Sequence, residues 1–312
     1  MSKNTICVSK KLVYSITGLM IVIFSLLVVN YLSNHKLKNS AEAAYNNKYK
    51  NFIIGGNQTR PADLPYVAAI VVKNSTIDIR CTGVLIKPQW ILTAAHCLKD
   101  VINVNDISVA VGITDVNDMN DLNTLKAENY FIDPEFLYAS NKDNFDVALI
   151  KLPSPINSVF LLPEIPDYQY VYSENGAQDL YAINSLVRVA GFGITMQDKV
   201  YQKMGVSNLF GINSKLNDIA LPIDNPVDNL DTDMDHVFLV GYDPNNLLNY
   251  LYTVGEGDSG GPILVAQTNR FLSPYLIGIV SQGTSGDAPL PFKAMKLTDF
   301  KSWIDQTIAN NG

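Results

Sequence analysis

From residue 53 onward the chain is a series of short runs rich in valine, isoleucine and leucine, and this pattern constrains the fold more than any other feature of the sequence. Clusters of glycine, proline, asparagine and aspartate separate the runs. Short strands at such spacing, without long helical periods between them, are typical of an all-β barrel or sandwich. The predicted strands cover 67–72, 84–86, 91–93, 107–111, 147–152, 186–190, 237–240, 263–265 and 276–280.

One helix is predicted at the C-terminus. Phe300, Trp303, Ile304 and Ile308 recur at helical spacing and would form one apolar face. Thr298 precedes them and is predicted to cap the helix, because a threonine hydroxyl can accept a hydrogen bond from a free N–H of the first turn. The predicted fold class is therefore all-β with a closing α-helix.

Composition and charge exclude several functional classes. Hydrophobic residues make up 47% of the 312 residues and charged residues 17%, which is typical of a packed globule with one large two-lobed unit or two domains. The net charge is −7, and because the first 52 residues are basic, residues 53–312 carry −13. Such a chain repels a phosphate backbone, so no nucleic-acid partner is expected. Three scattered cysteines are too few for a four-thiolate site, so neither a metal nor a cofactor is expected.

Residues 12–32 form an uncharged apolar stretch that follows three lysines. Its length can span a bilayer, and the preceding positive charge predicts a cytoplasmic start and an exported remainder. Residues 1–32 are therefore either a signal peptide or a membrane anchor, and the protein is predicted to be secreted, periplasmic or anchored through this segment alone. A small-x-small sequence at 41–43 lies well past the apolar stretch, which favours the anchor. The polar residues 33–52 are predicted to be a linker or pro-segment.

A histidine follows the predicted strand at 91–93. His96 comes after two alanines and precedes Cys97. Small residues at a strand end leave room for a fixed imidazole, whose ordinary pKa near neutrality suits proton transfer. His236 is the other histidine after residue 52, so the sequence offers two candidate bases.

A serine flanked by glycines precedes the predicted strand at 263–265. Ser259 lies in the sequence GDSGGP at 257–262. Glycine allows backbone N–H groups to converge, and those of Gly257 and Ser259 could form an oxyanion hole. An ordinary β-turn is the structural alternative.

An aspartate stands directly before the predicted strand at 147–152. Asp146 would enter the core there, and a buried carboxylate needs a hydrogen-bond donor to offset its desolvation. The imidazole of His96 is a fitting donor, because a carboxylate can fix the tautomer of a catalytic histidine. Asp143, in the polar loop, is the alternative.

The motifs TAAHC, DVALIKL and GDSGGP occur in the order His, Asp, Ser, and together they resemble the chymotrypsin-like (trypsin-fold) serine endopeptidase family. The resemblance extends over residues 53–312. It implies two antiparallel six-stranded β-barrels, at 53–170 and 171–312, with the active site in the cleft between them. Three further motifs belong to it, namely IIGG at 53–56, CTG at 81–83 and SQG at 281–283.

The resemblance implies a role for each motif residue. Ser259 would be the nucleophile, His96 the general base and then acid, and Asp146 the carboxylate that orients the imidazole. The N–H groups of Gly257 and Ser259 would bind the oxyanion. These roles match the chemical needs of a serine nucleophile, which is weak until a positioned base takes its proton.

Two covalent features are also implied. Cys81 and Cys97 match the family's disulfide beside the histidine. Cleavage before Ile53 would free an amine that pairs with Asp258, so the uncut chain is predicted to be a zymogen. The bond to be cut follows Phe52, and no basic residue stands at that position.

The predicted specificity pocket departs from that of trypsin-like members. Thr253 stands where those members carry an aspartate, and Gln282 replaces the usual tryptophan. Ser281 and Gly283 complete the predicted pocket. Because no acid lies at its base, selectivity for arginine or lysine is not expected.

These features predict an exported serine endopeptidase whose partners are protein and peptide substrates and a protein inhibitor. The membrane is expected to be a partner only through the N-terminal segment. A catalytically silent relative that uses the fold to bind a protein is the alternative. Some relatives bind calcium in the loop that here carries four acids, but a solvated acidic loop is predicted instead. These acids are Asp115, Asp118, Asp121 and Glu128.

Overall fold

The computed structural model describes most of the chain that follows residue 56. All described residues belong to a unit that extends from Asn51 to Gly312. No helix in this part is long and apolar enough to cross a membrane. The predictions for residues 12–32, 33–52, Ile53 and Thr253 lie outside the described residues. The described ranges are 57–60, 62–73, 78–139, 142–157, 161–167, 180–182, 184–194, 215–224, 236–241, 254–265, 273–283 and 291–312.

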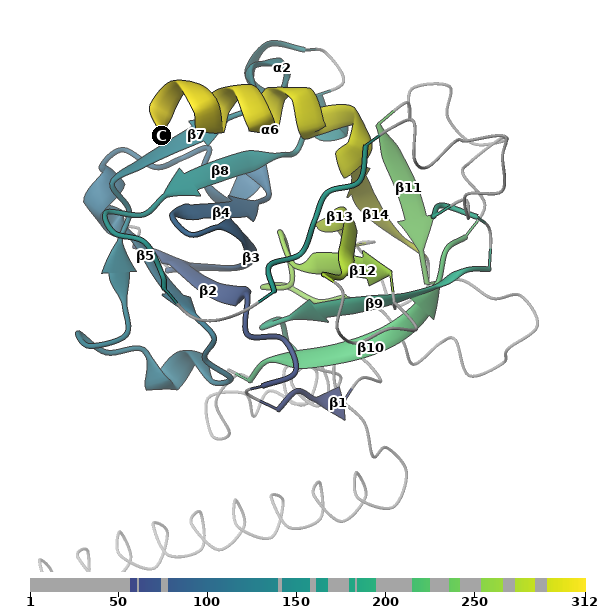
Figure 1. Ribbon diagram of the computed structural model, residues 1–312, viewed down its shortest axis with the longest axis horizontal. Helices are drawn as coiled ribbons and strands as arrows, with labels where there is room; N and C mark the ends of the chain where they lie inside the picture. Colours follow the sequence, from purple (N-terminus) through teal and green to yellow (C-terminus); the bar gives the residue numbers. More distant parts are fainter. Residues whose placement is uncertain are drawn as a thin grey trace, which may run out of the picture. The chain divides into compact units, whose positions relative to one another are not determined.

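The first of two antiparallel sheets is built from the first half of the described chain, coloured purple to teal in Figure 1. Its strand order is β6-β5-β2-β3-β4-β8-β7. The strands are β2 (Val67–Val72), β3 (Ile79–Lys87), β4 (Trp90–Thr93), β5 (Ile107–Val111), β6 (Leu125–Lys126), β7 (Asn129–Ile132) and β8 (Ala148–Lys151).

The second sheet is built mainly from the later part of the chain, in the order β1-β10-β9-β12-β13-β14-β11. Strand β1 precedes the first sheet in sequence but pairs with β10 of the second. The strands are β1 (Asn57–Gln58), β9 (Leu186–Gly191), β10 (Asn217–Pro222), β11 (Val237–Val240), β12 (Pro262–Val265), β13 (Tyr275–Gln282) and β14 (Phe292–Lys296).

The prediction of a mainly antiparallel β chain with a C-terminal helix is confirmed. The strand number differs from the implied six, because each described sheet has seven strands. Each sheet has one edge strand of two residues, β1 and β6. Strands this short carry no sequence pattern of their own, and they exist because the neighbouring strand offers free backbone groups.

Successive buried residues explain why the central strands appear as continuous apolar runs. All four residues of β4 are buried, and β8 is buried from Ala148 to Ile150. Leu92 of the first sheet and Ile279 of the second belong to one hydrophobic cluster. A second cluster surrounds Phe238 and Phe292 within the second sheet. The two sheets are therefore joined by a shared core.

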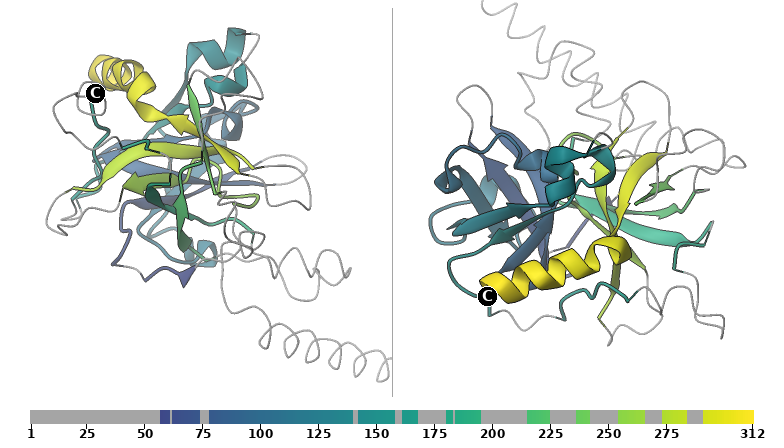
Figure 2. Two further views of the ribbon diagram at one scale, coloured as in Figure 1. Left: turned by 90° about the vertical axis from the view of Figure 1, so that its right-hand side faces the viewer. Right: turned by 90° about the horizontal axis from the view of Figure 1, so that it is seen from above.

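Helix α6 (Leu297–Asn311) follows β14 directly and closes the chain (Figure 2). The prediction that Thr298 caps this helix is wrong, because Lys296 occupies the N-cap position without a side-chain bond. Leu297 is fully buried, so packing determines where the helix begins. The other described helices are α2 (Pro134–Tyr138) and the 3-10 turns η1 (Ala95–Cys97), η2 (Val104–Asp106), η3 (Val116–Asp118) and η4 (Lys142–Asn144).

Candidate active site

His96 lies in the short turn η1 directly after strand β4. Ala94 and Ala95 are completely buried, so the chain turns sharply without crowding the imidazole. Cys97 forms a disulfide with Cys81 of β3, and their Cα atoms are 6.4 Å apart. This is the pairing that the family resemblance implies. Both ends of the turn are thus attached to the core of the first sheet.

Asp146 lies beside His96 because of the register between β4 and β8. Thr93 at the end of β4 is paired with Ala148 at the start of β8 in an antiparallel ladder. The His96 backbone N–H donates to Asp146 Oδ1 over 2.8 Å, and its Nδ1 lies 2.7 Å from Asp146 Oδ2. Asp143, the alternative, is exposed in η4.

Three donors surround the Asp146 carboxylate, which is only 3% exposed. The third is Ser281 Oγ, which donates to Oδ2 over 2.6 Å. A buried carboxylate with several donors avoids much of the cost of desolvation. Since a carboxylate only accepts hydrogen bonds, it holds the proton on His96 Nδ1 and leaves the Nε2 lone pair available to take up a proton.

Ser281, which is predicted to line the specificity pocket, also donates a hydrogen bond from its hydroxyl to Asp146. Gln282 and Gly283, which follow it at the end of β13, are exposed. A Cβ added at Gly283 would lie 3.5 Å from Val254 Cγ2. Gly283 therefore lies close to Val254, the residue that follows Thr253 in the chain. Sequence reasoning found Ser281 through its motif but not its bond to the aspartate.

The glycine-rich loop before β12 is built around the buried side chain of Asp258. Its carboxylate accepts hydrogen bonds from the backbone N–H groups of Gly193 and Gly255, each over 2.7 Å. A Cβ at Gly191 or Gly193 would overlap this carboxylate. Gly257 has a φ of +100°, which side chains rarely adopt. The loop therefore needs glycine both for its backbone conformation and for the space around Asp258.

The contacts of β3 bring Ser259 to the same region as His96. The backbone N–H of Thr82 donates to the Ser259 carbonyl over 2.8 Å. Thr82 adjoins Cys81, whose disulfide partner Cys97 adjoins His96. The two halves of the predicted triad, from different sheets, are thus connected through one strand.

Thr82 is a residue of the site that sequence reasoning missed. Its motif was recognised, but the hydroxyl was given no role. The structure places that hydroxyl between the Gly257 carbonyl, at 2.7 Å, and the Phe192 N–H, at 3.1 Å. Both partners are more than a hundred residues away in sequence, so no local signal could have indicated the contact.

His236, the second candidate base, lies elsewhere. Its Nδ1 is 3.1 Å from Asp299 Oδ2, and its ring packs on those of Phe145 and Phe300, with centroids 5.0 and 5.7 Å away. These contacts place it in the packing between β11 and α6.

Several of the candidate metal ligands have other partners. Cys81, His96 and Cys97 have ligand atoms within 4.8 Å of one another, but the sulfurs are bonded together. In the acidic loop, Glu128 pairs with Lys151 at 3.1 Å and Asp115 accepts a bond from the Asn117 N–H.

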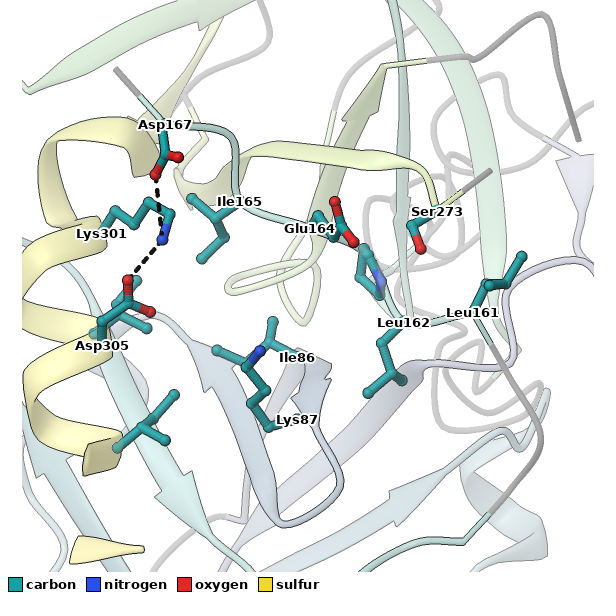
Figure 3. Close-up of a pocket in the computed structure, with 13 residues that line it drawn as sticks. Ile86, Lys87, Leu161, Leu162, Glu164, Ile165, Asp167, Ser273, Lys301 and Asp305 are labelled. Atoms are coloured by element: carbon teal, nitrogen blue, oxygen red, sulfur yellow. Dashed lines mark hydrogen bonds and ion pairs between the residues drawn. The ribbon is translucent and has the colours of Figure 1, made fainter. Parts of the chain in front are cut away.

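A cavity of about 540 Å³ lies away from the residues of the predicted site, between α6, residues 161–167 and the end of β3. Figure 3 shows Lys301 between two carboxylates on its rim, with Nζ 3.5 Å from Asp167 Oδ1 and 2.6 Å from Asp305 Oδ2. Its lining contains none of the triad, oxyanion or pocket residues predicted from the sequence.

Comparison with known proteins adds two findings. A family model described as Trypsin matches residues 53–304, which contain His96, Asp146 and Ser259. The chain is also similar to kallikrein-4 from Homo sapiens. The two sequences are 26% identical over 269 residues, which is 82% of this chain and 87% of the relative.

Proposed function

The chain belongs to the trypsin family, and we propose that it is an active serine endopeptidase that hydrolyses peptide bonds in exported or extracellular proteins. The observation that carries this proposal is the hydrogen-bonded pair of His96 and the buried Asp146 beside the Ser259 loop. The family is that of serine proteases, and a base oriented by a carboxylate is what a serine nucleophile requires.

In the proposed reaction, His96 Nε2 takes the proton of Ser259 Oγ as this oxygen forms a bond to the scissile carbonyl carbon. The carbonyl oxygen becomes negative and accepts hydrogen bonds from the N–H groups of Gly257 and Ser259. His96 then gives its proton to the leaving amine as the C–N bond breaks, which yields an acyl-enzyme and the first peptide product. Water repeats the sequence, with His96 as base, and releases the acid. Asp146 stays ionised and stabilises the imidazolium.

The proposed substrates have an uncharged residue before the cleaved bond. Thr253 is the residue at the predicted pocket base, and it carries no charge to bind arginine or lysine. Small, medium and apolar side chains are therefore the expected class. A peptide library that showed a dominant arginine or lysine preference would contradict this and would direct attention to Glu256 at the loop edge.

The proposed location is outside the cytoplasm, with the segment at 12–32 acting as the signal or anchor and a protein inhibitor as a second partner. The competing function is a catalytically silent module that binds protein. The three donors to Asp146 favour the enzyme, because this arrangement is needed for catalysis but not for binding.

Fluorophosphonate labelling tests the proposal. The wild-type protein is expected to react at Ser259, and Ser259→Ala and His96→Ala are expected to remain unlabelled. The N-terminus of each sample is sequenced first, so that an unprocessed chain is not mistaken for a silent one. A processed wild type that fails to label would support the binding module.

Peptide hydrolysis by the same variants gives the second readout. Ser259→Ala and His96→Ala should each lose about 10⁴- to 10⁶-fold in kcat, and the double variant should be little worse, because the residues act as one unit. Near-normal turnover by His96→Ala would exclude the proposed base.

A further inference from the structure

Thr82 in β3 has all its backbone and side-chain polar groups engaged, and the residue is completely buried. Its N–H donates to the Ser259 carbonyl over 2.8 Å, and its carbonyl accepts from Thr93 Oγ1 over 2.8 Å. Its hydroxyl donates to the Gly257 carbonyl over 2.7 Å and accepts from the Phe192 N–H over 3.1 Å. One side chain thus connects three segments that are distant in sequence.

The carbonyls of both residues proposed to bind the oxyanion are held by Thr82. Its N–H holds that of Ser259, and its hydroxyl holds that of Gly257. The Gly257 carbonyl belongs to the peptide plane that leads to Asp258. Fixing this oxygen therefore restricts rotation of the loop between the two proposed donors.

The loop needs such an anchor because of its own glycine. Gly257 adopts a φ of +100°, and a glycine can leave this conformation for others at little cost. A Cβ at Gly257 would lie 3.0 Å from Gly193 Cα, so the loop also packs closely on the segment that follows Phe192. The Thr82 hydroxyl joins these two packed segments at the point of contact.

We propose that Thr82 is a positioning residue for catalysis, whose hydroxyl holds the Gly257 peptide so that the N–H groups of Gly257 and Ser259 face the developing oxyanion. This inference rests on the proposed protease function. Donors that are already oriented stabilise a transition state without a cost of reorganisation. A hydroxyl suits the position because it donates and accepts at once, which valine, of similar shape, cannot do.

The test compares Thr82→Val, Thr82→Ser and the wild-type full chain after processing. We expect Thr82→Val to lower kcat by about 10- to 100-fold with KM changed by less than about threefold, because the orientation of donors affects the transition state more than substrate binding. Thr82→Ser keeps the hydroxyl and should keep kcat within about threefold of the wild type. Should Thr82→Val not fold, Thr82→Ala provides the same contrast with Thr82→Ser.

Thr59→Val is the matched control. Thr59 is also a buried threonine, 3% exposed, and its hydroxyl donates to Asp218 Oδ1 over 2.8 Å at the far edge of the second sheet. Its replacement should lower Tm but leave kcat within about twofold. A normal kcat in the hydroxyl-free Thr82 variant, or an equal loss in Thr59→Val, would overturn the proposal.

Failure of the protease function itself would be seen first, as a processed wild type that neither hydrolyses peptides nor reacts with a fluorophosphonate. Amide hydrogen exchange then tests the anchor directly. Exchange in residues 255–260 should be faster in Thr82→Val than in Thr82→Ser, and equal exchange in the two variants would overturn the proposed anchor.

Discussion

Asp146 shows how single residues make the site. Its carboxylate is buried, and two of its three donors come from His96 while the third comes from Ser281 in the other sheet. Each donor offsets part of the desolvation of the charge and narrows the orientations that the carboxylate can adopt. The orientation of the imidazole therefore depends on Asp146 and, through Asp146, on Ser281.

Replacing Ser281 tests this arrangement. A hydrogen bond to a charged group contributes about 1.5–3 kcal/mol, so we expect Ser281→Ala to lower kcat/KM by at least about tenfold. Ser108→Ala is the matched control, because Ser108 Oγ accepts a bond from Lys126 Nζ over 2.8 Å in the first sheet, away from the proposed site. The measurement is the kcat/KM of the two variants in steady-state kinetics. An equal loss of kcat/KM in both would mean that the hydrogen bond from Ser281 to Asp146 does not support catalysis.

At the scale of elements, strand junctions place the functional loops. The antiparallel pairing of β4 with β8 brings the end of β4, before His96, next to the start of β8, after Asp146. The pairing of β12 with β13 likewise brings the glycine-rich loop before β12 next to Ser281 near the end of β13. The segment that follows β9 supplies the Gly193 N–H that holds Asp258. The site is therefore made by the ends of strands whose registers are determined by buried apolar residues.

The segment after β9 should not tolerate a side chain at Gly193. A Cβ there would overlap the Asp258 carboxylate, so Gly193→Ala should displace the loop and lower the free energy of unfolding by about 1–3 kcal/mol. Activity should fall with it. Gly283→Ala is the control for stability, since its Cβ would make an ordinary contact of 3.5 Å with Val254. Urea denaturation compares them, and a Gly193→Ala protein as stable and active as the wild type would refute the packing argument.

Tyr66, the buried residue directly before strand β2, predicts a pH dependence of the free energy of unfolding. Burial raises the pKa of Tyr66, which directly precedes β2, from 10.0 to about 12. The folded protein therefore keeps the phenol proton after the unfolded chain has lost it, and stability should fall between pH 10 and about pH 12, by about 2–3 kcal/mol for this group.

Tyr66→Phe removes this titration, so its stability should fall less than that of the wild type over the same pH range. Tyr138→Phe, at a side chain that is 84% exposed, is the control for loss of a phenol. Urea midpoints measured from pH 9 to about pH 12 provide the comparison. Parallel curves for wild type and Tyr66→Phe would show that Tyr66 does not contribute.

At the scale of the whole described unit, the two sheets depend on each other. They share a hydrophobic cluster, β1 crosses from the start of the chain to the second sheet, and β3 binds the Ser259 loop. Strand β1 begins four residues after Ile53, on the sheet whose loop carries Asp258. The predicted cleavage before Ile53 would therefore create a new chain end close in sequence to a strand of the sheet that carries the proposed oxyanion loop.

Cleavage between Phe52 and Ile53 is the predicted activation step. The new amine would pair with Asp258, whose carboxylate already accepts hydrogen bonds from two backbone N–H groups. The uncut chain lacks this ion pair and should be largely inactive. Phe52 is a suitable residue for an uncharged pocket, so we predict that one molecule activates another. The Ser259→Ala precursor expressed alone should keep residues before Ile53, as N-terminal sequencing would show.

Addition of a small amount of processed wild type is the control for that experiment, and it should convert the Ser259→Ala precursor to a chain that begins at Ile53. If Ile53 became the N-terminus of the isolated variant at the normal rate, a different protease would perform the cleavage.

The sequence by itself determined the strand-rich fold, most of the strand positions and the residues proposed for catalysis. These are local properties, since an apolar run such as Val67–Val72 or a motif such as GDSGGP is complete within a few residues. Only the tertiary structure decided the short edge strands β1 and β6, the start of α6 and the hydrogen-bond partners of Ser281 and Thr82. Ser281 and Asp146 are 135 residues apart, and Thr82 and Gly257 are 175 apart. A hydroxyl has no preferred partner until folding brings a buried donor or acceptor within reach, so its role depends on contacts that no local pattern contains.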